Sequence, residues 1–251
     1  MKSDSTDRYS VSQTVTDGVY RLLVEAILYG DLASSSRLIL QDLAEKYQVS
    51  LSPVREALQR LATEGFIEAT PRRGYRIRKP SARHVTELWQ VRVGLEITAG
   101  ELLIERMQAT GDRSALQMME KLQTQMESNS GMTHREHIEL NTAFHKALID
   151  GSGNQLLANF YHSIQMQLLG AWVQRGVDDW RLRLKVEGDE HRALLQALKE
   201  RRTVQLAAAI RGHLGRSLQS AINDLLAQPE PAEDRQTSKA LEHHQRQGTT
   251  Q

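Results

Sequence analysis

Hydrophobic residues repeat at helical spacing in two adjoining stretches of the first quarter of the chain. Residues 42–47 fit a short helix, and Gln48 and Val49 fit a tight turn after it. A longer helix follows, which Ser52 is expected to cap and Gly65 to end, and its apolar side chains recur at i, i+4 and i+7 as Val54, Leu58 and Leu61. A short helix, a turn and a longer helix with a polar leading edge predict a helix-turn-helix suited to a DNA major groove.

The pattern changes after this motif. Residues 66–70 have strand-like character, residues 71–74 form a turn, and residues 75–78 alternate like a second strand. This hairpin, with basic residues at its tip, predicts a winged helix-turn-helix. A further helix over residues 14–29 is expected to support it, so that the DNA-binding domain spans residues 13–79.

A second, all-α domain is expected over residues 84–227, after a linker at residues 80–83. Glycine and polar breaks divide its helical pattern into helices near 84–109, 112–129, 134–150, 154–175, 178–199 and 203–227. The polar ends of the chain, residues 1–12 and 228–251, are expected to be disordered. The fold class is therefore mainly α, with a winged N-terminal domain followed by a helical bundle.

Charge separates the two parts. From Arg37 to Arg83 ten Lys and Arg residues stand against five Asp and Glu residues, a net of +5, whereas the whole chain is +1. This asymmetry indicates a polyanion partner for the winged domain alone. The chain has no cysteine, which excludes disulfides and thiolate metal sites. It also lacks an apolar run of about 18 residues, so a membrane role is not expected. The absence of cysteine fits a cytoplasmic protein.

The residues expected to contact DNA lie at the start of the longer helix and in the wing. Arg55 has the reach for a guanine edge or a phosphate, and nearby hydroxyls suit either. The predicted set is Gln41, Ser50, Ser52, Arg55, Arg72, Arg73 and Gly74. The alternatives are a solvated helix-turn-helix that binds proteins and, for Arg55, a surface pair with Glu56 or Gln59.

Four polar residues interrupt apolar stripes of the second domain. Asn141 and His145 are i, i+4 neighbours on one helix, whereas His191 and His213 lie among leucines on two others. Each needs a partner when buried, and a divalent metal would satisfy all four together. Hydrogen-bonded core histidines are the alternative. Among the remaining histidines, His84, His134, His137 and His162 show no such arrangement and are interpreted as surface or structural residues.

The motif VSLSPVREALQRLATEGFIEATPRRGYRI resembles the DNA-binding domain of the GntR family of bacterial transcription regulators. Leu51 departs from the resemblance, because that position is usually basic. The later motifs Asn141-x-x-Phe144-His145, Ser152-Gly153-Asn154 and Glu190-His191, followed by His213-Leu214, are similar to the FCD ligand-sensing domain of the FadR-type subgroup.

The resemblance implies specific roles. It places metal ligands on Asn141, His145, His191 and His213, with zinc or nickel expected as one divalent ion per chain, and it directs Arg92 at an effector carboxylate. The alternative for Arg92 is an i, i+4 ion pair with Glu96. Implied partners are double-stranded DNA with an inverted-repeat operator, a small carboxylate effector and a second copy of the chain in a homodimer.

The sequence therefore predicts a transcription regulator, not an enzyme, whose DNA affinity an organic acid controls at a metal-containing pocket. A metal sensor is one alternative. A metal-dependent hydrolase with an accessory DNA-binding domain is the other, but no catalytic residue is assigned, because there is no H-E-x-x-H motif and no evident general base beside the histidines. Glu190 adjoins His191, but its side chain is expected to point elsewhere on the helix.

Overall fold

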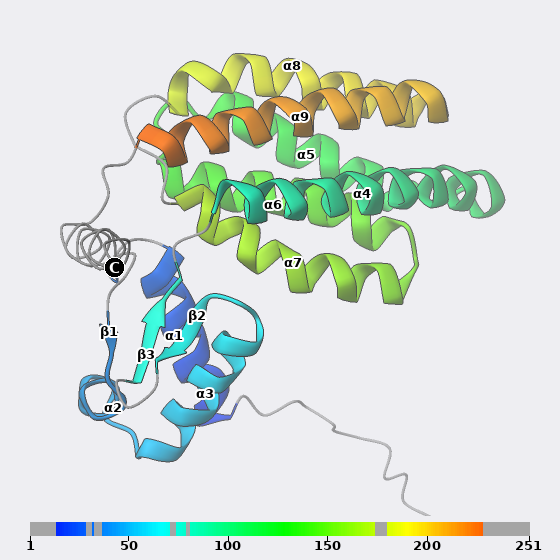
Figure 1. Ribbon diagram of the computed structural model, residues 1–251. Helices are drawn as coiled ribbons and strands as arrows, with labels where there is room; N and C mark the ends of the chain where they lie inside the picture. The colour runs from blue at the N-terminus through cyan, green and yellow to red at the C-terminus, as the bar shows by residue number, and fades with distance from the viewer. Residues whose placement is uncertain are drawn as a thin grey trace, which may run out of the picture. The chain divides into compact units, whose positions relative to one another are not determined.

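A computed structural model of the 251-residue chain describes residues 14–28, 32, 37–70, 74–78, 81–173 and 180–227, with no side-chain description for 28, 165–173 and 227 (Figure 1). The chain divides into two compact units, residues 1–79 and 80–251. The expected terminal tails, residues 1–12 and 228–251, lie outside the described residues.

The first unit contains three helices and a small antiparallel sheet in its described residues. Helix α1 spans Val15–Leu28, α2 Leu40–Tyr47 and α3 Leu51–Thr63, and the strands are β1 Arg37–Leu38, β2 Ile67–Thr70 and β3 Gly74–Ile77. The strand order is β1-β3-β2, with Ile67 opposite Ile77 and Leu38 opposite Tyr75. The winged helix-turn-helix is thus confirmed, and β1 is an element that the sequence pattern had not indicated.

Helix α3 starts at Leu51, two residues earlier than a cap at Ser52 would allow. Ser50, not Ser52, occupies the cap position, and its side chain makes no capping hydrogen bond. Ser52 lies inside the first turn, where its hydroxyl donates to Glu56 Oε1 over 3.2 Å. The turn before α3 uses Gln48 in the left-handed region at φ 53°. Gly65 adopts φ 82° just after the helix, as a terminating glycine should.

The predicted stripe of α3 is the core of this unit. Val54, Leu58 and Leu61 are fully buried, as is Leu23 of α1. Arg60 lies over the Tyr20 ring at 3.9 Å and donates to Glu64, whose carboxylate also accepts from the Tyr20 hydroxyl. These contacts hold α3 against α1.

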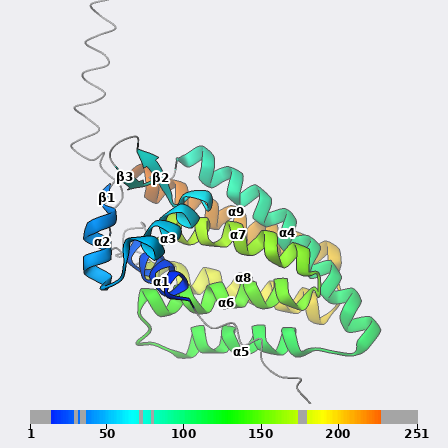
Figure 2. The same cartoon turned by 90° about the horizontal axis from the view of Figure 1, so that it is seen from below.

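The described part of the second unit is helical throughout, which confirms the all-α expectation. Its helices are α4 Ala82–Thr110, α5 Ser114–Ser128, α6 His134–Gly151, α7 Gln155–Val173, α8 Trp180–Lys199 and α9 Thr203–Ala227. Helices α5, α6, α7 and α8 run roughly along one direction, and α4 is inclined to them (Figure 2). Helix α4 begins inside the expected linker, because Ser81 Oγ accepts the backbone N–H of His84 and caps the helix two residues early.

A close helix contact and a helix cap fix the two ends of α6. At Gly151 a Cβ would lie 2.5 Å from Ala115 Cβ, so the end of α6 and the start of α5 approach too closely for any larger residue. Thr133 and Glu136 form a reciprocal capping box that starts α6. These features position the polar residues of α6 against their neighbours.

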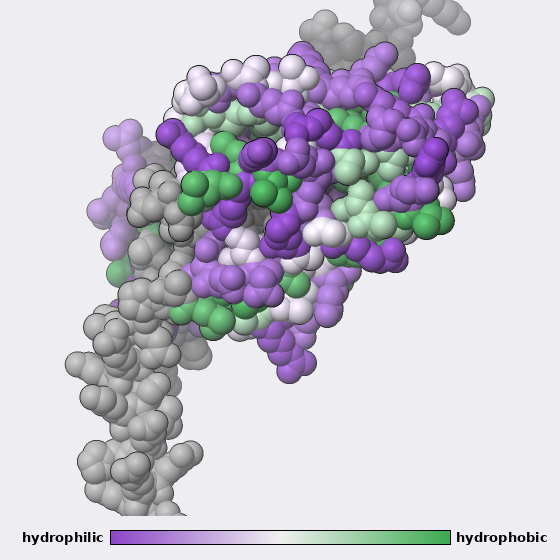
Figure 3. All heavy atoms as spheres, turned by 90° about the horizontal axis from the view of Figure 1, so that it is seen from above, coloured by the Kyte–Doolittle hydropathy of each residue, from purple (hydrophilic) through white to green (hydrophobic). Residues whose placement is uncertain are grey.

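Hydrophilic residues cover most of the face of the molecule drawn in Figure 3, and the hydrophobic patches there are small. None of the helices in the described residues has the length and apolar character needed to cross a membrane.

Candidate functional site

The predicted DNA-contacting residues of the first unit are exposed wherever the structure describes them. Gln41, Ser50, Ser52 and Arg55 all have exposed side chains. Glu56 accepts hydrogen bonds from Thr16 and Ser52, and within the described residues no ion pair engages Arg55. The guanidinium of Arg55 is therefore available to a partner on the open face of α3.

The tip of the wing lies only partly within the described residues. Arg72 and Arg73 fall outside them, so the structure adds nothing to their predicted role. Gly74 is described, at φ 86°, and a Cβ there would lie 2.9 Å from the backbone oxygen of Leu38. Glycine is thus required for the close pairing of β3 with β1. This structural role is separate from the predicted contact of Gly74 with DNA.

In the second unit three histidines converge at the centre of the bundle. His145 on α6, His191 on α8 and His213 on α9 are 0%, 1% and 3% exposed. One ring nitrogen from each lies within 4.8 Å of the others, and His145 Nε2 is 3.2 Å from His213 Nε2. The convergence expected from the three helical stripes is therefore present.

Each histidine uses its Nδ1 to reach an oxygen atom on another helix. His145 Nδ1 lies 2.9 Å from Glu96 Oε2 of α4, and His213 Nδ1 lies 2.9 Å from Glu190 Oε2 of α8. His191 Nδ1 lies 2.8 Å from Gln123 Oε1 of α5. Because carboxylate and amide oxygens only accept hydrogen bonds, the Glu and Gln partners place the proton on Nδ1 and leave each Nε2 with a lone pair.

Glu190 corrects one interpretation made from the sequence. Its position next to His191 on a helix suggested that its side chain points away from the histidines. The structure instead brings its carboxylate to His213. Arg216 pairs with the same carboxylate from the side of α9.

Among the residues that the structure describes, one atom of the triad and one atom of the residue a turn before His145 on α6 are buried without a hydrogen-bond partner. They are Asn141 Oδ1 and His191 Nε2. An unpaired buried acceptor costs about 1–3 kcal/mol, and two lone-pair nitrogens facing each other at 3.2 Å repel. A divalent cation would remove all of these penalties. Two ligand nitrogens about 2.0–2.1 Å from one tetrahedral ion are themselves separated by roughly 3.3 Å, which matches the His145–His213 spacing. The donor set therefore fits a metal ion.

The protonation states of the histidines suit ligation. Burial lowers the pKa of the His145 imidazole to about 4, although Glu96 opposes the change. Burial also lowers the pKa of His191 and of His213 below the ordinary histidine value. The imidazoles are accordingly neutral near pH 7, which is the state that binds metal.

Arg92 is held by a buried network on α4. Its Nε donates to Glu96 Oε1 over 2.6 Å, and the Tyr161 hydroxyl of α7 donates to the same oxygen over 3.2 Å. Burial raises the pKa of the Glu96 carboxyl, but the neighbouring His145 and Arg92 lower it by a larger amount. The pKa of Glu96 is therefore below the ordinary value of a glutamate. The ion pair foreseen between Arg92 and Glu96 thus exists, buried and joined to the histidine cluster.

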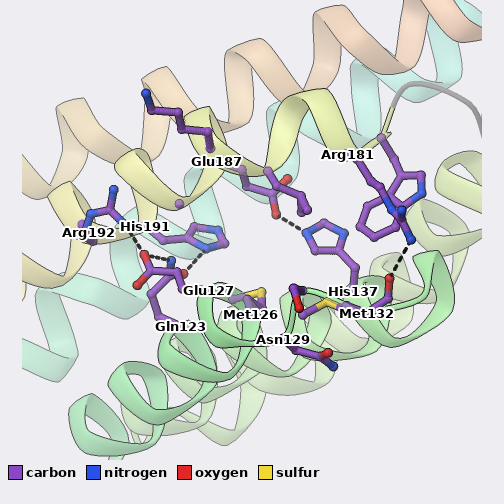
Figure 4. Close-up of a pocket in the computed structure, with 15 residues that line it drawn as sticks. Gln123, Met126, Glu127, Asn129, Met132, His137, Arg181, Glu187, His191 and Arg192 are labelled. Atoms are coloured by element: carbon purple, nitrogen blue, oxygen red, sulfur yellow. Dashed lines mark hydrogen bonds and ion pairs between the residues drawn. The ribbon is translucent and has the colours of Figure 1, made fainter.

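Two cavities reach the histidine cluster from the α8 side. One of about 340 Å³ is lined by His191 and Gln123 (Figure 4). The other, of about 150 Å³, is lined by His213 and Glu190. Neither is lined by Arg92. His137, Trp180 and Glu187 line both, and His137 Nε2 lies 2.9 Å from Glu187 Oε1. His137, which the sequence left as surface or structural, is therefore a buried residue between the two cavities.

Comparisons with known proteins agree with both halves of this description. The family model described as bacterial regulatory proteins, gntR family, matches residues 15–77, and the FCD domain model matches residues 87–216. The chain is 31% identical over 174 residues to the Nta operon transcriptional regulator of Aminobacter aminovorans, covering 69% of this chain and 78% of that protein. It is 29% identical over 184 residues to the uncharacterized HTH-type transcriptional regulator YdhC of Bacillus subtilis, covering 72% and 80%.

Solved structures share the fold. The E. coli McbR/YncC structure matches with a TM-score of 0.68 at 23% identity, covering 84% of this chain and 98% of that one. A putative GntR regulator from Rhodococcus sp. RHA1 matches with a TM-score of 0.63 at 22% identity, covering 86% and 99%.

Proposed function

The chain belongs to the gntR family of bacterial regulatory proteins, with an FCD domain after its DNA-binding domain, and we propose that an organic acid bound at a metal centre in the FCD domain controls its DNA affinity. DNA-binding transcription regulation is the function of this family. The observation that carries the proposal is the convergence of the three histidines, whose Nδ1 atoms are all engaged elsewhere, together with the buried, unpartnered Oδ1 of Asn141 one turn before His145 on α6.

The proposed centre holds one divalent ion per chain, zinc or nickel. Its ligands are Asn141, His145, His191 and His213. All four are neutral donors, so a bound ion would keep its full positive charge and act as an electrostatic anchor for an anion. The Nδ1 bonds to Glu96, Gln123 and Glu190 support the proposal, because outer partners of this kind orient histidine ligands in metal sites.

The proposed effector is a small carboxylate. Its carboxylate would meet the ion and the guanidinium of Arg92, which gives planar, two-pronged recognition. Arg92 is joined to the centre through Glu96, since Glu96 bonds both Arg92 and His145. An effector that binds the Arg92 guanidinium would therefore disturb the hydrogen bond between Glu96 and His145 Nδ1, which orients the imidazole. Such a change would shift the population between DNA-competent and incompetent forms.

On the DNA side, the proposed contacts are Gln41, Ser50, Ser52 and Arg55 of the helix-turn-helix and Arg72, Arg73 and Gly74 of the wing. One recognition helix reads only a few base pairs, so two copies of the chain on an inverted-repeat operator are the proposed binding unit. A homodimer of this kind presents two winged domains to successive turns of the duplex.

Replacing Arg55 with alanine is expected to weaken operator binding by about 1–3 kcal/mol and to relax base preference at one position, because a base-reading arginine is lost. Fluorescence anisotropy on an operator selected from a random duplex library measures both effects. The matched control is Arg37→Ala, which removes an exposed arginine of β1 outside the predicted contact set. Unchanged affinity in Arg55→Ala would remove this residue from the DNA-reading set.

One preparation tests the proposed function. Protein purified without chelator should contain close to one equivalent of metal per chain, and dialysis against a chelator should lower its Tm until zinc or nickel is returned. Operator affinity is then measured with and without metal across a panel of small mono- and dicarboxylates. A carboxylate that changes operator affinity only when metal is present supports the proposal.

The same preparation separates the two alternatives. Metal alone changing operator affinity, with no carboxylate effect, indicates a metal sensor. Turnover of ester or amide substrates that depends on metal indicates a hydrolase. A protein without metal, whose Tm does not respond to either ion, would mean that the three histidines are ordinary core residues.

A further inference from the structure

We propose that Gln123 is the positioning residue that sets how tightly His191 holds the metal, and that its neutral amide keeps His191 the weakest of the three histidine ligands. This inference rests on the metal centre of the proposed function. It concerns the one histidine of the three whose Nδ1 partner lacks a negative charge.

The first support is the geometry of the amide. Gln123 is 4% exposed, and its Oε1 accepts from His191 Nδ1 over 2.8 Å. Its Nε2 donates to Glu127 Oε1 over 2.8 Å, and the same Glu127 oxygen pairs with Arg192 of α8 (Figure 4). A carboxylate can only accept, so Glu127 fixes the amide with its nitrogen towards itself and its oxygen towards His191. The relay Arg192–Glu127–Gln123 thereby selects the His191 tautomer that leaves Nε2 for a metal.

The second support is the space provided for this relay. Gly188 lies in α8 within one turn of His191, where glycine weakens a helix relative to alanine. A Cβ at this position would lie 3.3 Å from Gln123 Nε2 and 3.5 Å from Glu127 Oε1. The glycine therefore lets α5 bring the amide and the carboxylate against α8.

The third support is the contrast among the three ligands. His145 and His213 donate to the carboxylates of Glu96 and Glu190, and a carboxylate partner raises the basicity of an imidazole ligand. His191 donates to an amide, which does so less. It is also the ligand that lines the larger cavity, of about 340 Å³, which His145 does not. The weakest bond to the ion is thus placed beside the roomier cavity, where an incoming ligand can compete with it.

The test is a series of zinc affinities, measured by competition with a chromophoric chelator on the full chain. Gln123→Leu removes the acceptor and is expected to lower zinc affinity about 10–100-fold. The exchange variant Q123E/E127Q keeps the net charge and the bond between the two positions but gives His191 a carboxylate. It is expected to bind zinc more tightly than the parent protein. Gln125→Leu, an exposed glutamine on the same helix, is the matched control and should leave the affinity unchanged.

A second readout does not depend on metal. Nitrogen-15 shifts of the histidine rings in the metal-free protein should place the proton on His191 Nδ1 in the parent and the exchange variant, and show mixed tautomers in Gln123→Leu. A purely structural role would lower the Tm of both variants without this pattern. Equal zinc affinity in the parent, Gln123→Leu and Q123E/E127Q would overturn the inference while leaving the metal centre intact. A parent protein that binds no zinc would overturn the proposed function as well, and the two failures are thereby told apart.

Discussion

Replacing His145 with alanine is expected to lower zinc affinity by about 100-fold or more and to remove the rise in Tm that metal gives the parent protein. His145 is fully buried and supplies an Nε2 only 3.2 Å from that of His213. Its loss leaves the ion with an incomplete set of donors. Because the ligands come from three helices that meet only in the folded bundle, metal binding stabilises folding, by about 2.7 kcal/mol at a metal concentration 100 times Kd. Thermal unfolding with and without zinc measures this loss.

The matched control is His162→Ala, which removes an exposed histidine of α7 outside the cluster. It should retain both the zinc affinity and the metal-dependent Tm. If His145→Ala kept the full metal-dependent rise in Tm, the ion would have to bind elsewhere in the chain.

Replacing Glu96 with leucine is expected to destabilise the bundle by about 3–5 kcal/mol, the largest stability loss foreseen for a single substitution in this chain. The carboxylate accepts from Arg92 and Tyr161 and lies 2.9 Å from His145 Nδ1, all within the core. Its removal leaves the guanidinium of Arg92, itself 4% exposed, without its buried counter-charge. Urea denaturation of parent and variant, in the metal-free state, measures the difference.

The double variant R92M/E96L is the control for this effect. Replacing both charges with apolar side chains of similar volume removes the uncompensated ion, and most of the stability should return. Zinc affinity should remain about 10–100-fold below that of the parent, because His145 has still lost the partner of its Nδ1. A Glu96→Leu protein as stable as the parent would show that the pair adds nothing to the core.

The candidate metal ligands could be predicted from the sequence because their positions follow the helical repeat of the apolar residues. Asn141 and His145 are one turn apart, and His191 and His213 interrupt leucine stripes, so the spacing alone assigns each of them to a core-facing side. Their partners were not accessible in this way. Glu96 and Gln123 lie 49 and 68 residues from the histidines that they contact. Only the packing of α4 and α5 against the other helices brings them together.

The features of the winged unit that the sequence did not predict have a different physical cause. Strand β1 has two residues, too short for any alternation to be seen, and it is fixed by pairing with β3. The start of α3 was misplaced because Ser50 and Ser52 are both good capping residues two positions apart. Gly74 was predicted as a DNA contact. The structure also requires a glycine there, because a Cβ would lie too close to the backbone oxygen of Leu38.

The most direct test of the metal centre is an anomalous difference map from crystals of the full chain grown with zinc and measured at the zinc edge. We expect one peak per chain, about 2.0–2.2 Å from Nε2 of His145, His191 and His213 and from Oδ1 of Asn141. A map with no peak among these residues, or with its peak bound instead by His137 and Glu187, would contradict the proposed centre.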